Sequence, residues 1–289
     1  MSSPIESLIQ KYNPKTSRDF ENALKEVMQE VTLAGLARAH FYREAAFYGG
    51  TALRIFYGLP RFSEDLDFTL FRHQPEFKLK PYFASVVELL ESFGFEAQIS
   101  EVPKDADRKV ESAFLKTNTQ IHLLKIEAAR EVAKKIPSNQ SLKIKFEVDV
   151  FPPSGFETEV KVLTPPITAS ICVLKPSSLF AGKMHAVLFR NWKNRVKGRD
   201  FYDLLWYLGQ KIPMKLSYLE QKMHEGGTLQ KTEKLTREKV SELLQTRLKA
   251  IDWENAKKDA IGFIQDPREV DAWDAELFLN AVDGLEVVP

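Results

Sequence analysis

Cysteine is nearly absent from this 289-residue sequence, which contains only Cys172. A single cysteine excludes an intrachain disulfide and a metal site built from cysteines alone, and it is typical of the reducing cytoplasm. Long hydrophobic runs are missing too, because no stretch approaches the ~20 apolar residues of a membrane-spanning helix. The first residues also lack the basic start and apolar core of a secretory signal. We therefore expect a cytoplasmic protein that does not associate with membranes.

A strong charge of either sign is also missing. Lys and Arg number 41 and Asp and Glu number 40, which gives a formal net charge of +1. Bulk charge therefore neither favours nor excludes a nucleic-acid partner, and only local patches can indicate one. The histidines show no paired metal-ligand spacing, and neither repeats nor low-complexity tracts occur. The hydrophobic content of 44% is that of an ordinary globular protein.

The pattern of the first part of the chain alternates helices and strands. Apolar spacing predicts a helix over residues 17–38 with Ser17 as its N-cap, and strict alternation over 142–150 predicts a strand. Residues 103–111 read as a charged turn, and residues 113–136 favour a helix over 122–135, with strands at 113–116 and 121–126 as the alternative. Further helices are expected at 51–57, 81–93 and 176–190, and further strands at 45–48, 66–71, 95–102 and 158–163.

After about residue 174 the sequence becomes helical in character. Helices are predicted over 199–207, 238–251, 253–264 and 272–281, with a polar loop at 223–235. We therefore predict an α/β (α+β) fold with an α/β domain over residues 1–174 and a helical C-terminal domain over residues 175–289.

Two carboxylates mark the most informative stretch, residues 48–70 (YGGTALRIFYGLPRFSEDLDFTL). Asp65 and Asp67 lie two residues apart in a strand pattern, so their side chains project from the same face. Adjacent like charges are costly unless a cation neutralises them, and Mg²⁺, with Mn²⁺ as an alternative, is commonly held by carboxylates and phosphates together. The pair therefore predicts a divalent metal site.

The same stretch contains a glycine pair ahead of an expected helix that begins at Thr51. Glycine lets backbone N–H groups approach a ligand closely, and a helix N-terminus attracts anions. A phosphate site beside a metal site suits phosphoryl transfer, which depends mostly on positioning and charge stabilisation. Either motif alone is common in turns and caps, and it is their order and spacing that indicate function. We expect nucleotide contacts from Gly49, Gly50, Thr51, Ser63 and Arg61, with Arg54 as an alternative source of positive charge.

Residues 49–68 (GGTALRIFYGLPRFSEDLDF) resemble the signature of nucleotidyltransferase toxins of the AbiEii/AbiGii type, members of the DNA polymerase β-like nucleotidyltransferase superfamily. Such toxins occur in the abortive-infection and toxin–antitoxin loci of bacteria and archaea. LKPSSLFAGKMHAVLFR (174–190) and KGRDFYDLLWYL (197–208) support the resemblance, which spans about residues 45–208. It implies a polymerase β-like core with a mixed sheet. It also implies Mg²⁺-dependent transfer of a nucleoside monophosphate from an NTP to an acceptor hydroxyl, with pyrophosphate released. An RNA acceptor such as tRNA and a cognate antitoxin are further implications.

The resemblance implies roles for four later residues. Asp149, on the expected strand 142–150, would be the third metal ligand beside Asp65 and Asp67, although with Glu147 it could equally be the solvated face of that strand. Lys183 would bind the nucleotide phosphates, the alternative being a solvated lysine. Asp200 and Asp203 would position or deprotonate the attacking hydroxyl, although acids also favour a first helical turn. The catalytic set is thus Asp65, Asp67, Lys183, Asp200 and Asp203.

A basic run, residues 190–199 (RNWKNRVKGR), could contact the phosphates of an RNA acceptor with Trp192 as a stacking face, or could be a solvated connection. Two other functions fit the same residues. One is a non-catalytic nucleotide- or partner-binding protein of this fold, and the other is a metal-dependent nuclease that uses the same carboxylates.

Overall fold

The computed structural model describes residues 4–101, 110–118, 134, 139, 141–164, 166–190 and 196–289. The chain forms two compact units. The first comprises Met1–Phe47, Glu64–Pro152 and Val160–Val173, and the second comprises Tyr48–Ser63, Pro153–Glu159 and Leu174–Pro289. The second unit therefore contains the glycine pair as well as the predicted helical range 175–289. Within the described ranges, no helix is long and apolar enough to cross a membrane.

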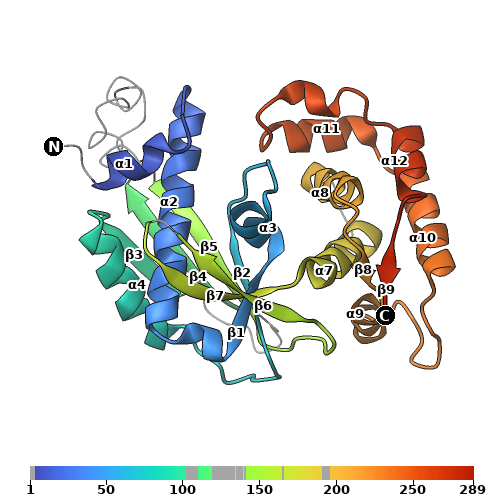
Figure 1. Cartoon of the computed structure of the whole chain (residues 1–289), viewed down its shortest axis with the longest axis horizontal. Coiled ribbons are helices and arrows are strands. Elements are labelled where there is room, and N and C mark those ends of the chain that lie inside the picture. The colour runs from blue at the N-terminus through green and yellow to red at the C-terminus, as the bar shows by residue number, and fades with distance from the viewer. Residues whose placement is uncertain are drawn as a thin grey trace. The chain divides into compact units, whose positions relative to one another are not determined.

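A mixed sheet is the framework of the first unit (Figure 1). In the part of the chain that the structure describes, seven strands run in the order β3-β4-β5-β2-β1-β7-β6. β2 pairs in parallel with β5, and β1 with β7, whereas β4 is antiparallel to both β3 and β5. The predicted mixed sheet is thus confirmed. The strands are β1 (Ala45–Tyr48), β2 (Leu66–Leu70), β3 (Ala97–Glu101), β4 (Val110–Asn118), β5 (Ser141–Asp149), β6 (Thr158–Leu163) and β7 (Ala169–Leu174).

The strand β5 shows why sequence alternation was informative. Leu142, Ile144, Phe146 and Val148 are buried, and the residues between them are not. Of the two interpretations of residues 113–136, the alternative strand at 113–116 is the correct one where the structure describes the chain, because β4 occupies Val110–Asn118 and pairs along its whole length with β5. Tertiary pairing therefore overrides the local propensity there. Val110 and Glu111, expected in a charged turn, also belong to β4. The expected helix 122–135 and strand 121–126 lie outside the described residues, apart from Lys134.

Helices α1 (Pro4–Gln10), α2 (Ser17–Arg38) and α4 (Lys80–Ser92), with the short 3₁₀ turn η1 (Phe41–Arg43), complete the first unit. Thr16, not the predicted Ser17, is the N-cap of α2, so the helix begins at Ser17, one residue earlier than a cap at Ser17 would give. The Thr16 hydroxyl accepts the Asp19 N–H at 3.2 Å, and the Asp19 carboxylate accepts the Thr16 N–H at 2.8 Å. α2 packs on α4 and β5, and α4 packs on β3, so both helices bury their apolar faces against the sheet layer.

The second unit is mainly helical, as the sequence predicts. Its elements are α3 (Gly49–Tyr57), α7 (Pro176–Phe189), α8 (Gly198–Gly209), β8 (Met214–Lys215), α9 (Leu216–Glu225), α10 (Arg237–Lys249), α11 (Trp253–Ile261), η3 (Pro267–Val270), α12 (Ala275–Val282) and β9 (Val287–Val288). α9 was missed, and its end occupies the start of the loop predicted at 223–235. Leu219 and Met223 in α9 are buried, and α9 packs on α7, a contact that the local sequence does not reveal. The parallel pair β8–β9 was also missed.

Two contacts fix the helices that bear the later site residues. The rings of Phe180 in α7 and Tyr207 in α8 stack with centroids 4.4 Å apart and an interplanar angle of 6°. At the start of α8, a Cβ on Gly198 would lie 1.9 Å from the carbonyl oxygen of Ala256 in α11. Only glycine therefore allows α8 to approach α11 this closely, and α8 is held on both sides.

Candidate active site

The predicted site residues fall into two groups, one in each unit. In the first unit, Asp65 directly precedes β2 and Asp67 lies within it, and both are half-buried. Leu66 and Phe68 on either side of Asp67 are fully buried. The acids therefore project from a rigid strand on the face opposite its apolar anchors, as the alternation predicts.

The register between β2 and β5 identifies the acid nearest to this pair. Asp67 lies opposite Glu147, and Thr69 lies opposite Asp149. Paired residues of adjacent strands share a face of the sheet, so Glu147 is the lateral neighbour of Asp67 and Asp149 lies one step further along. The family resemblance implies Asp149 as the third ligand, and the register of these two distant strands, which one sequence cannot reveal, adds Glu147 as a second candidate. The alternation of β5 did place Glu147 and Asp149 on one face.

Both of these later acids have partners in the chain. Glu147 accepts a hydrogen bond from Lys145 Nζ at 2.6 Å, and Asp149 Oδ1 accepts the Phe151 N–H at 2.9 Å. Among the described residues, no group of three or more His, Cys, Asp or Glu side chains is arranged to hold a metal ion. The donors that the strands do bring together are carboxylate oxygens, and this is the donor type that suits a hard divalent cation.

In the second unit, the glycine pair forms the first turn of α3. Gly49 has a φ of 83°, a left-handed conformation that favours glycine. A Cβ on Gly50 would lie 2.8 Å from Arg61 Nη2 and 2.9 Å from Ser63 Oγ. The buried Thr51 hydroxyl donates to Ser63 Oγ at 2.9 Å. The first turn of α3 is therefore packed directly on the segment that contains Arg61 and Ser63, and both Thr51 and Ser63 are buried.

Arg61 makes the most buried ion pair of the site. Its Nε and Nη2 donate to the two carboxylate oxygens of Asp203 at 2.6 Å each, and its Nη1 donates to the Phe62 carbonyl at 2.8 Å. Arg61 is 3% exposed and Asp203 is 0% exposed. The guanidinium thus has a protein partner for each of its three nitrogens. Arg61 was predicted as a nucleotide ligand, and the structure surrounds its charge with protein instead.

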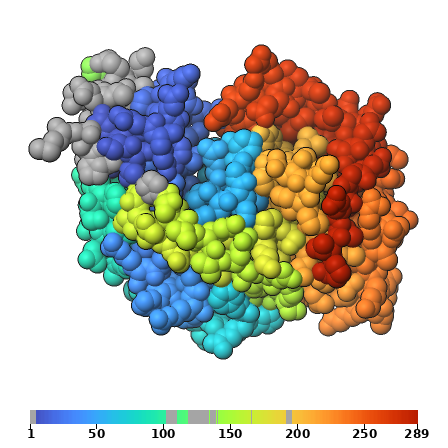
Figure 2. All heavy atoms as spheres, in the orientation of Figure 1, coloured from blue at the N-terminus to red at the C-terminus, as the bar shows by residue number. Residues whose placement is uncertain are grey.

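Lys183 lies in α7 between the two aspartates of α8. Its Nζ donates to Asp200 Oδ1 at 2.7 Å and lies 2.9 Å from Asp203 Oδ2. Its side chain is 15% exposed, so Lys183 is mostly but not fully buried. The structure therefore brings Arg61, Lys183, Asp200 and Asp203 into one cluster from three segments of the chain. The light-blue α3 segment lies beside the yellow-to-orange α7 and α8 segments on the face seen in Figure 2.

Arg190 is a member of this cluster that the sequence did not single out. Its Nη1 donates to Asp200 Oδ2 at 2.5 Å, and its side chain is 40% exposed. Arg190 begins the basic run, of which residues 191–195, with Trp192, lie outside the described residues. At the end of the run, Arg199 stacks on the ring of Phe263 with its guanidinium carbon 3.7 Å from the centroid. With three cations and two carboxylates, the cluster has a formal charge of 3 − 2 = +1.

The charges of the cluster stabilise one another. Burial alone would raise the pKa of Asp203, but Arg61 and Lys183 outweigh it and lower that pKa. Burial likewise acts to raise the pKa of Asp200, and Lys183 and Arg190 lower it overall. Burial acts to lower the pKa of Lys183, and Asp200 and Asp203 reverse this and raise it. All of these groups are therefore ionised near neutral pH.

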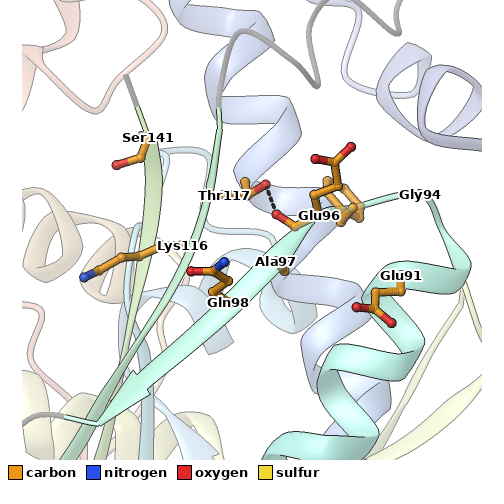
Figure 3. Close-up of a pocket in the computed structure, with 9 residues that line it drawn as sticks. Glu91, Gly94, Glu96, Ala97, Gln98, Lys116, Thr117 and Ser141 are labelled. Carbon is orange, nitrogen blue, oxygen red and sulfur yellow. Dashed lines mark hydrogen bonds between the residues drawn. The ribbon is translucent and has the colours of Figure 1, made fainter. Parts of the chain in front are cut away.

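None of the predicted site residues lines a hollow in the first unit (Figure 3). Its volume is about 840 Å³, and the Thr117 hydroxyl donates to the Glu96 carbonyl at 2.7 Å within it. Its lining contains charges of both signs, from Glu91, Glu96 and Lys116. This hollow offers neither the acidic pair nor the cation cluster, so we do not assign the nucleotide to it.

A carboxylate pair on a strand, a glycine turn at a helix start and a lysine held by aspartates are kinds of group that phosphoryl transfer uses. The family model of the nucleotidyl transferase AbiEii toxin of type IV toxin–antitoxin systems matches residues 31–280. The chain belongs to this family of nucleotidyltransferases.

Two solved structures from Helicobacter pylori are similar to this chain. JHP933 is 18% identical with a TM-score of 0.49, and the match covers 91% of this chain and 90% of that one. A candidate nucleotidyltransferase is also 18% identical, with a TM-score of 0.46 and coverage of 89% and 90%. No curated protein matches the chain. The family assignment rests on the family model alone.

Proposed function

We propose that this protein transfers a nucleoside monophosphate from an NTP to an acceptor hydroxyl and releases pyrophosphate. The observation that carries the proposal is the carboxylate pair of β2, which faces a third acid, Glu147, across a parallel strand pair. Membership of a nucleotidyl transferase toxin family supports the same reaction class.

Asp65 and Asp67 are the residues that would hold Mg²⁺, or Mn²⁺ in its place. When bound, such a metal stabilises the charge on the attacking and leaving oxygens. Asp149 is the third ligand that family resemblance implies, and Glu147 is the alternative that the strand register supports. Comparison of Asp149→Asn with Glu147→Gln distinguishes them, because only loss of the true ligand should raise the Mg²⁺ concentration needed for half-maximal activity.

Lys183 is our candidate for the phosphate ligand, with the turn at Gly49 and Gly50 as the source of backbone donors. A lysine that stays charged and partly exposed suits a triphosphate. Asp200 and Asp203 act as positioning residues for Lys183 in this proposal. A role as the base for the acceptor hydroxyl is less well supported, because a carboxylate whose pKa is lowered and whose oxygens already accept ion-pair bonds is a weak base.

The acceptor in this proposal is an RNA, with tRNA as the first candidate, and a cognate antitoxin restrains the activity in the cell. The family description supports the antitoxin. Arg190, partly exposed at the start of the basic run, supports a polyanionic acceptor. The single cysteine is compatible with the cytoplasm, where NTPs and RNA are available.

The test is to incubate the purified protein with total RNA, Mg²⁺ and each NTP labelled at the α-phosphate, with parallel reactions labelled at the γ-phosphate. Transfer of the monophosphate labels RNA from the α-position only, and chelation with EDTA abolishes it. RNA cleavage without NTP would instead identify a nuclease. NTP binding with neither outcome, across all four nucleotides and the tested acceptors, would leave the non-catalytic binding protein as the better description.

A further inference from the structure

The Arg61 side chain connects two parts of the second unit that bind nucleotide in the proposed function. On one side its Nη2 packs against Gly50, where an added Cβ would lie 2.8 Å away. On the other side its Nε and Nη2 donate hydrogen bonds to both carboxylate oxygens of Asp203. Asp203 in turn lies 2.9 Å from Lys183 Nζ. The chain of contacts therefore runs from the glycine turn of α3, through Arg61 and Asp203, to the Lys183 ammonium.

Two properties favour a supporting role for Arg61 over direct contact with a ligand. Each of its three guanidinium nitrogens donates to a protein oxygen, and the residue is 3% exposed. Lys183, by contrast, keeps an exposed fraction of 15% in its side chain. Lys183 and Arg190, which is 40% exposed, are thus the more accessible cations of this cluster, and Arg61 is the most buried of the three.

We propose that Arg61 is a positioning residue that fixes the Lys183 ammonium relative to the glycine turn of α3 by holding Asp203 in bidentate geometry. Without this grip, Asp203 is neutralised by Lys183 alone, and the ammonium is drawn toward the aspartates and away from the nucleotide. The charge of the cluster also falls from +1 to 0 when Arg61 becomes neutral, which weakens its attraction for phosphates. The inference rests on the proposed function, since it assumes that Lys183 contacts the NTP.

Arg61→Lys separates geometry from charge, because lysine keeps the positive charge and loses the planar bidentate fork. We expect Arg61→Lys to bind NTP with an affinity within about twofold of the parent but to slow single-turnover transfer by about tenfold or more. Arg61→Met, which removes the charge as well, should also weaken NTP binding. Arg268→Lys is the matched control, since Arg268 makes the same bidentate pair with Asp266 on the surface and should leave both quantities unchanged.

A double-mutant cycle tests whether Arg61 acts through Lys183. In a Lys183→Met background, Arg61→Lys should change the transfer rate by less than about twofold, because the group that it positions is already gone. Effects that add independently would overturn the inference, as would an Arg61→Lys protein with the parent rate. If the residual rate of Lys183→Met is too low to measure, the same cycle is read from NTP affinity with Arg61→Met. If Arg61→Met does not fold, Asp203→Asn replaces it, since it loosens the same grip from the other side.

Failure of the proposed function would give different results from failure of the positioning role of Arg61. A parent protein that binds NTP in a Lys183-dependent manner but transfers nothing would refute nucleotidyl transfer and still allow the affinity cycle to be measured. A parent that transfers nucleotide with additive Arg61 and Lys183 effects would refute the positioning role alone. NTP affinity that is the same in the parent and Lys183→Met would contradict both.

Discussion

The buried pair between Arg61 and Asp203 makes an asymmetric stability prediction. Breaking a buried ion pair typically destabilises a protein by about 3–5 kcal/mol, because the remaining charge is left uncompensated. The two variants that break this pair, Arg61→Met and Asp203→Leu, leave the remaining charge with different partners. In Arg61→Met, Asp203 keeps Lys183 as a partner at 2.9 Å. In Asp203→Leu, the buried guanidinium loses its paired carboxylate and keeps the hydrogen bond to the Phe62 carbonyl and the more distant charge of Asp200.

We therefore expect Arg61→Met to cost about 2–3 kcal/mol and Asp203→Leu to lie in the full range of about 3–5 kcal/mol. The double variant should be more stable than Asp203→Leu, because replacing both charges with apolar groups leaves neither buried and unpaired. Equilibrium urea unfolding measures all three, and the m-value must stay constant for the midpoints to be compared.

The control is Arg268→Met, which breaks the pair between Arg268 and Asp266, whose shortest contact is also 2.6 Å but which lies on the surface. Its unfolding midpoint should match that of the parent, since exposed pairs contribute little. The reasoning would be refuted if Arg61→Met were as harmless as Arg268→Met, or if Arg61→Met were more damaging than Asp203→Leu.

Two further predictions concern the same unit. Gly50→Ala should destabilise the protein by about 1–3 kcal/mol, because its Cβ meets Arg61 and Ser63. Gly209→Ala should not, because a Cβ at the end of α8 projects into open space. Equal unfolding midpoints for the two variants would contradict the tight first turn of α3. Burial lowers the pKa of His185 to about 4, with help from Lys222 and Arg190, so the fold favours the neutral imidazole. The stability that this residue contributes is present above pH 6.5 and is lost as the pH falls toward 4. In thermal unfolding measured across this pH interval, a His185→Gln protein should therefore lose less stability than the parent. An unchanged pH profile of stability would refute this.

Much of the fold follows from local signals in the sequence. Three elements could be predicted from local patterns: β5 from its alternation, α3 from the glycine pair in its first turn, and α2 from its apolar spacing. In each of them the pattern of side chains repeats regularly along the element. β4 was anticipated only as an alternative strand at 113–116, and α9 was missed, because their identity depends on pairing with β5 and packing on α7. Local propensity carries no information about such partners.

The candidate site likewise contains residues that a local pattern reveals and residues whose partners are distant in sequence. Asp65 and Asp67 could be recognised because they are two residues apart on one strand. The hydrogen bond between Arg61 and Asp203 joins residues 142 positions apart, so each residue was assigned a separate role from its own local motif, and their pairing could not be inferred. Glu147 was passed over for a similar reason, because its position opposite Asp67 depends on the register of two strands distant in sequence.

The most direct test of the central claim is incorporation of α-labelled nucleotide into RNA by the parent protein and by Asp67→Asn, with Asp266→Asn as a surface control. The account predicts labelling by the parent and the control in the presence of Mg²⁺, and loss of labelling in Asp67→Asn with an unchanged unfolding midpoint. Undiminished labelling by a folded Asp67→Asn protein would contradict the assignment of the β2 carboxylates as the metal-binding core of a nucleotidyltransferase.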